Sequence, residues 1–124
     1  MAPLIQVALG GAVGASARYL SGLAMTHLMG KSFPWNTMFV NFLGSFLMGV
    51  VVVTLAHENG NRFAPLLMTG MLGGFTTYSA FSLDAMTIIE RGDYGIGAFY
   101  VLGTLVLALG GIALGLFAAR SFYA

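Results

Sequence analysis

Four apolar segments, separated by short polar loops, fill nearly all of the 124 residues of this chain. They cover approximately residues 5 to 28, 35 to 56, 65 to 89 and 96 to 119. A membrane-spanning helix needs about 20 predominantly apolar residues, so each segment is long enough to cross a bilayer. Only 7% of the residues are charged, against about 25% in a soluble domain, and the mean hydropathy is +0.89. The sequence therefore predicts one all-α integral membrane domain, residues 1 to 124, with four transmembrane helices.

The third segment contains an unusual stretch, GMLGGFTTYSAFS, at residues 70 to 82. Its glycines at positions 70, 73 and 74 each cost a helix about 1 kcal/mol relative to alanine. Its hydroxyl side chains can bond nearby backbone groups instead of leaving the helix intact. We therefore expect the third helix to be broken near the middle of the membrane. Unwound backbone at that depth is tolerated where it is buried in protein or lines a watery cavity or ion site, so the break is the expected functional centre.

Arg18 is the only arginine or lysine within the first segment. An arginine in a transmembrane helix is costly and usually faces a polar cavity or a partner, so Arg18 could line an electropositive vestibule that attracts anions. Alternatively, its long side chain could extend to the nearer membrane interface. Gly10 and Gly14 on the same helix face form a GxxxG motif, as do Gly111 and Gly115 in the fourth segment. Such motifs are typical of closely packed helices.

Polar side chains recur every four residues in the second segment, at Thr37, Asn41 and Ser45, which places them on one helix face. The Asn41 amide has two N–H donors that could hold an anion. It could equally make an interhelical hydrogen bond, worth about 0.6 kcal/mol. In the third segment Tyr78 and Phe81 share a face, and their electropositive ring edges could solvate a small anion. Ordinary packing is the alternative role for this pair.

The break offers a second possibility. Carbonyls freed from the helix, such as those of Gly73 and Thr76, could coordinate a cation. Asp84 lies further along the same segment, where it could pair with a basic residue or lie close enough to the interface to stay hydrated. In the fourth segment Tyr100 and Thr104 share one face and are its main polar groups.

Several function classes are disfavoured by the residues present. The net charge of +1 argues against a nucleic-acid partner. The chain has no cysteine, and His27 and His57 lie in different loop regions without paired carboxylates, so a side-chain metal site is not expected. No GxxxxGK[ST] motif for nucleotide binding is present. We therefore expect a protein that is not an enzyme and that does not couple its action to nucleotide hydrolysis.

The basic residues near the ends of the segments are evenly divided between the two sides of the membrane. Arg62 and Arg120 fall on the side that holds both termini, whereas Lys31 and Arg91 fall on the opposite side. The positive-inside rule therefore gives no preferred orientation. We expect the chain to insert in both orientations and to form an antiparallel homodimer.

Three segments closely resemble the signature segments of the Fluc family, the CrcB-type fluoride channels. They are GGAVGASARY (residues 10 to 19), NTMFVNFLGSFLMG (residues 36 to 49) and GMLGGFTTYSAFS (residues 70 to 82). The number of spans, their spacing and the chain length agree with that family over essentially the whole sequence. The resemblance implies a dual-topology homodimer in the bacterial inner membrane, with two antiparallel pores that passively export fluoride from the cytoplasm. It also implies a structural sodium ion at the centre of the dimer.

The resemblance implies roles for individual residues. Gly73 and Thr76 would offer backbone carbonyls to the sodium from both subunits, and Arg18 would be the vestibule arginine. The fluoride path would be lined by Thr37, Asn41, Tyr78, Ser79, Phe81, Tyr100 and Thr104. The chain departs from the family pattern TTFSTFS at Tyr78 and Ala80, and it has Ala108 where relatives often have serine. These differences bear on the rate of conduction.

Two other function classes remain as alternatives. Small multidrug transporters are also four-span, dual-topology dimers, but they need a carboxylate in the first span. Here the polar groups of that span include Gln6 and Arg18, and the first acidic residue is Glu58. The second alternative is a structural or assembly subunit, in which the polar stripe and the broken helix would serve packing only.

Overall fold

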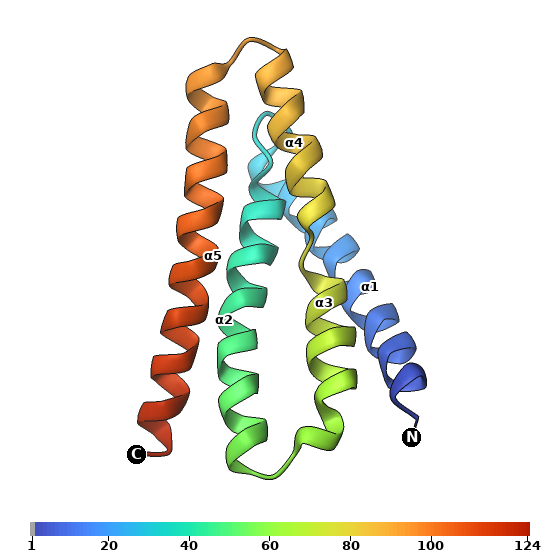
Figure 1. Cartoon of the computed structure of the whole chain (residues 1–124). Coiled ribbons are helices and arrows are strands. Elements are labelled where there is room, and N and C mark those ends of the chain that lie inside the picture. The colour runs from blue at the N-terminus through green and yellow to red at the C-terminus, as the bar shows by residue number, and fades with distance from the viewer. Residues whose placement is uncertain (1) are drawn as a thin grey trace.

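The computed structural model describes residues 2 to 124, and within that range the chain is helical and contains no strand. In chain order the elements are α1 (Pro3–Met29), α2 (Trp35–His57), the 3-10 turn η1 (Asn61–Phe63), the π-helix η2 (Pro65–Leu72), α3 (Gly73–Phe75), α4 (Tyr78–Glu90) and α5 (Tyr94–Phe122). The chain makes four passes, and the third consists of η2, α3 and α4 in succession (Figure 1). Both termini consequently lie at the same end of the molecule.

Two helices, α2 and α5, are long and apolar enough to cross a membrane. α2 has 23 residues, about 35 Å of helix at 1.5 Å per residue, and the hydrocarbon core is about 30 Å thick. The predicted segments 35 to 56 and 96 to 119 therefore correspond closely to real helices. In the third pass the longest continuous helix is α4, with 13 residues, because the break divides that segment.

The break in the third pass lies at Thr76 and Thr77, whose backbones are extended. The expected break is therefore present, but the glycines do not make it, because Gly73 and Gly74 are still helical in α3. Thr77 is the N-cap of α4, and its hydroxyl accepts a hydrogen bond from the N–H of Ala80 at 3.1 Å. This is the usual way in which threonine satisfies a free N–H at a helix start.

Gly70 and Gly74 of the third pass serve close packing against α1. A methyl carbon added at Gly14 would overlap the carbonyl oxygen of Met71, and one added at Gly10 would overlap that of Leu66. On the other side of this contact, a methyl carbon at Gly74 would lie 2.9 Å from the Gly11 carbonyl oxygen. Packing of this closeness is what a GxxxG motif predicts. It holds α1 directly against the segment that leads into the break.

The second GxxxG motif brings α5 against α2. A methyl carbon at Gly115 would overlap the carbonyl oxygen of Phe46, and one at Gly111 would lie 3.0 Å from that of Phe42. Across this contact, a methyl carbon at Gly49 would lie 2.5 Å from the carbonyl oxygen of Ile112. The two apolar helices therefore touch along their backbones.

Gly115→Ala is expected to lower the stability of the folded chain by about 1–3 kcal/mol, since the added carbon forces α2 and α5 apart. The midpoint of thermal unfolding can be followed in detergent by the fluorescence of Trp35, the single tryptophan. Gly110→Ala is the matched control on the same helix, because a carbon added there has nothing within 4 Å. Equal midpoints for the two variants would contradict the packing account.

Candidate functional site

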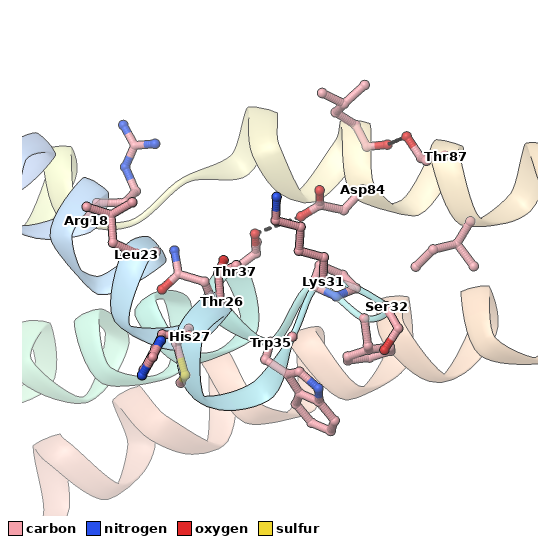
Figure 2. Close-up of a pocket in the computed structure, with 18 of the residues that line it drawn as sticks. Arg18, Leu23, Thr26, His27, Lys31, Ser32, Trp35, Thr37, Asp84 and Thr87 are labelled. Atoms are coloured by element: carbon pink, nitrogen blue, oxygen red, sulfur yellow. Dashed lines mark hydrogen bonds between the residues drawn. The ribbon is translucent and has the colours of Figure 1, made fainter.

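Two cavities in the structure are lined by polar and aromatic side chains. We call the first, of about 1080 Å³, the wide cavity; its lining includes Arg18, His27, Lys31, Thr37, Asp84 and Arg91 (Figure 2). We call the second, of about 470 Å³, the narrow cavity; its lining includes Asn41, Ser45, Thr77, Tyr78, Phe81, Thr104 and Ala108. The narrow cavity lies beside the break, between α2, α4 and α5.

The wide cavity has an excess of positive charge. Three of the five lysine and arginine residues line it, whereas Asp84 is its only carboxylate. Arg91 is partly compensated at the exposed edge, where its Nε donates to Asp93 Oδ2 at 3.0 Å. Arg18 and Lys31 come from α1 and the loop after it, and Figure 2 shows both at this cavity with Asp84. A cleft lined by charge of one sign raises the local concentration of counter-ions, here small anions.

Arg18 connects the wide cavity to the break. Its Nε donates a hydrogen bond to the carbonyl oxygen of Gly74 at 3.1 Å, two residues before Thr76. The guanidinium is half-buried, and this bond uses only one of its five N–H donors. Of the two interpretations of Arg18, the arrangement therefore favours a side chain that faces a cavity.

Asp84 accepts hydrogen bonds from two other helices. The Thr37 hydroxyl donates to Asp84 Oδ2 at 2.7 Å, and the Tyr100 hydroxyl donates to the same oxygen at 3.0 Å (Figure 2 shows the first). Tyr100 is fully buried and Thr37 is nearly so. The partners of Asp84 are thus hydroxyl groups, rather than the basic residue or the open water considered from the sequence. This connection between α2, α4 and α5 lies at the inner end of the wide cavity.

Asn41 binds both backbone polar groups of Thr77 in the break. Its Nδ2 donates to the carbonyl oxygen of Thr77 at 3.0 Å, and its Oδ1 accepts from the Thr77 N–H at 2.8 Å. The interhelical hydrogen bond considered for Asn41 is therefore present. Because this pairing uses only one hydrogen of the NH₂ group, the amide keeps a second donor. Asn41 also lines the narrow cavity, so its amide can bind Thr77 in the break and still donate a hydrogen bond into the cavity.

A row of aromatic rings runs from Tyr78 and Phe81, which line the narrow cavity, to Phe33, which lines the wide one. The Tyr78 and Phe81 rings meet edge to face, with centroids 5.8 Å apart, and the Phe81 and Tyr100 centroids are 5.5 Å apart. Phe33 then meets Tyr100 edge to face at 5.6 Å. Phe81 lines the narrow cavity, while the Tyr100 hydroxyl reaches the Asp84 carboxylate in the wide cavity. The expected shared face of Tyr78 and Phe81 is confirmed, and the Phe81 ring also packs against the ring of Tyr100.

The predicted site residues thus fall into two adjoining sets. Thr37 and Tyr100 belong with Asp84, whereas Asn41, Tyr78, Phe81 and Thr104 line the narrow cavity. The two sets are one helical turn apart, from Thr37 to Asn41 on α2 and from Tyr100 to Thr104 on α5. Ser79 lines neither cavity; it is exposed, and its hydroxyl lies 3.4 Å from that of Thr77.

Asp84 and Ser45 line these cavities but are not among the predicted path residues. The sequence did not indicate which residue would pair with Asp84. Its two hydrogen-bond partners, Thr37 and Tyr100, lie 47 and 16 residues away along the chain, on other helices. Ser45 lines the narrow cavity one turn beyond Asn41. The regular spacing of Thr37, Asn41 and Ser45 was the available signal for Ser45.

The carbonyls of Gly73 and Thr76 are suited to bind a cation. In a continuous helix they would accept from the N–H groups of Thr77 and Ala80, four residues later. Instead, the Thr77 N–H donates to Asn41 Oδ1, and the Ala80 N–H donates to Thr77 Oγ1. Both carbonyls have therefore lost their helical partners, as in the unwound segments that coordinate sodium in transporters. Among residues 2 to 124, no cluster of histidine and acidic side chains could hold a metal.

Comparison with known proteins gives consistent matches along the whole chain. Residues 5–116 match the family described as CrcB-like protein, Camphor Resistance (CrcB). A protein of Cereibacter sphaeroides named Fluoride-specific ion channel FluC is 60% identical over 121 residues, which cover 98% of this chain and 97% of that protein. Proteins of the same name from Ruegeria sp. and Agrobacterium fabrum are 50% and 45% identical, each over 94% of this chain and over 94% and 95% of their own lengths. With the family match and this coverage together, the chain belongs to the CrcB family.

Proposed function

We propose that this protein is a fluoride channel that conducts the ion passively and is not an enzyme. The names of its relatives and its family membership support the ion and the activity. The observation that carries the proposal in this chain is the pair of cavities. One is lined by several basic side chains, and the other is lined by an amide, hydroxyl groups and aromatic rings. These groups attract and solvate a small anion without covalent chemistry.

In this proposal fluoride collects in the wide cavity near Arg18 and Lys31 and then passes the level of Thr37 and Tyr100, whose hydroxyl hydrogens are already donated to Asp84. It continues to the second N–H of Asn41 and the edge of the Phe81 ring. Asn41 and Phe81 each replace part of the hydration shell, yet neither carries a full positive charge. A series of such sites admits the ion and still releases it, as conduction requires.

We further propose that α1, α2, the broken third pass and α5 each cross the bacterial inner membrane, and that two copies pair antiparallel. The evenly divided basic residues support insertion in both orientations. Tyr78 is 81% exposed in the single chain, and Ser79 is also exposed. A second copy packed at the break would cover them and complete two pores that export fluoride from the cytoplasm.

The same arrangement supports a structural sodium ion between the two copies. Each copy offers the carbonyls of Gly73 and Thr76 near the break, so a symmetric pair would supply four oxygen ligands. When bound, the ion would neutralise these carbonyl dipoles and hold the two copies together. The residues of this chain fit such an ion without any charged side chain.

Ion efflux from liposomes that contain the purified protein tests the proposed function. With equal outward gradients, we expect rapid loss of fluoride and negligible loss of chloride. A fluoride-selective electrode and a chloride-selective electrode measure the two efflux rates, and protein-free liposomes provide the background. A folded protein that released neither ion would favour a structural or assembly role, and equal release of both would contradict fluoride selectivity.

A further inference from the structure

The narrow cavity changes in polarity along its length. On α5 its wall carries Thr104, Ala108 and Ile112 at four-residue spacing, so only the first of these positions is polar. On α2 the wall continues from Asn41 to Ser45, one turn further from the wide cavity. Beyond Thr104 the α5 wall therefore offers no polar side chain to an ion, and polar contact must come from α2 and the third pass.

The hydroxyls near this cavity differ in whether their hydrogen is already used. The Thr76 hydroxyl donates to the Leu72 carbonyl at 2.9 Å, and the Ser82 hydroxyl donates to that of Tyr78 at 3.1 Å. Serine and threonine in helices commonly donate to the carbonyl four residues earlier in this way. A hydroxyl with its hydrogen so placed is a poor donor to anything in a cavity.

Ser45 and Thr104 are different. Thr104 is only 6% exposed, and its buried hydroxyl has no partner among residues 2 to 124. The Ser45 hydroxyl is half-buried and likewise makes no hydrogen bond within this part of the chain. A buried polar group without a partner costs about 1–3 kcal/mol, so such hydroxyls are expected to bond to the contents of the cavity that they line. Both lie on its wall.

We propose that Ser45 is a further fluoride-contacting residue, which supplies the hydroxyl donor for the half of the narrow cavity beyond Asn41. This inference rests on the proposed function. Ser45 follows Asn41 by one turn, about 6 Å along α2, which is a suitable step for an ion that passes from one donor to the next. Ala108, on the α5 wall of the same cavity, is apolar and offers no donor of its own.

Ser45→Ala tests this inference in the same liposome assay. The efflux rate of fluoride is expected to fall about tenfold, because the loss of one hydrogen-bond donor leaves an ion partly unsolvated. Adding Ala108→Ser to Ser45→Ala returns a hydroxyl from the facing wall, and we expect this double variant to recover most of the rate. Ser82→Ala is the matched control, since that hydroxyl donates to backbone outside the cavity, and its rate is expected to equal that of the wild type.

The outcomes separate the inference from the function on which it rests. A wild-type protein without fluoride efflux would reject the proposed function itself. If the wild type conducts and Ser45→Ala conducts equally fast, the inference is wrong while the function stands. A low rate in Ser45→Ala that Ala108→Ser does not raise would assign Ser45 to packing, and this also overturns the inference.

Discussion

Phe81→Ile is expected to reduce fluoride efflux by about 100-fold, equivalent to about 2.7 kcal/mol in the barrier to conduction. Phe81 lines the narrow cavity and stands between the rings of Tyr78 and Tyr100. Its electropositive ring edge can solvate an anion, whereas the aliphatic isoleucine offers no such group. A dehydrated ion at that position would lack a partner, and an unpaired polar group in an apolar environment costs several kcal/mol.

The measurement compares initial efflux rates at equal amounts of reconstituted protein. Phe63→Ile is the matched control, because Phe63 is 42% exposed on the η1 turn, outside both cavities. Elution of Phe81→Ile at the wild-type volume in size-exclusion chromatography would show that the assembly is intact. A rate within about threefold of the wild type would be difficult to reconcile with an ion path beside this ring, since it corresponds to less than 1 kcal/mol.

The helices could be predicted well because their signal is local. An apolar run of sufficient length has few alternatives to a helix in a membrane, and α2 begins at Trp35, where the second segment was expected to begin. The position of the break was less predictable. Gly73 and Gly74 suggested an interruption, but both are helical, and Gly74 serves close contact with α1, which depends on a neighbouring helix. The actual break depends on Thr77 as a cap and on Asn41 from α2.

The candidate site shows the same division between local and non-local information. The shared face of Tyr78 and Phe81 follows from spacing within one helix, and it is present in the structure. The bonds from Thr37 and Tyr100 to Asp84 join three helices, so spacing within one segment could not reveal them. For the same reason, the sequence did not show that Thr37 and Tyr100 form one set with Asp84 while Asn41 and Thr104 line another cavity.

Asn41→Asp is the second substitution from which we expect a large effect, again a loss of about 100-fold or more in fluoride efflux. Aspartate has nearly the same shape and can still accept from the Thr77 N–H, as Asn41 Oδ1 does at 2.8 Å. It cannot donate to the Thr77 carbonyl, which Asn41 Nδ2 reaches at 3.0 Å. Two acceptors would then face each other, and a negative charge would stand in a cavity that must admit an anion.

Repulsion between the carboxylate and fluoride distinguishes this effect from a simple loss of structure. Asn41→Ala also removes the bonds to Thr77 but adds no charge, so we expect it to retain more efflux than Asn41→Asp if the amide faces the ion. Asn61→Asp, an exposed change on the η1 turn, controls for added charge elsewhere and is expected to conduct at the wild-type rate. Equal losses in Asn41→Asp and Asn41→Ala would mean that Asn41 acts only by holding the break. A larger loss in Asn41→Asp would indicate that the anion passes the amide, because the added carboxylate charge repels it there.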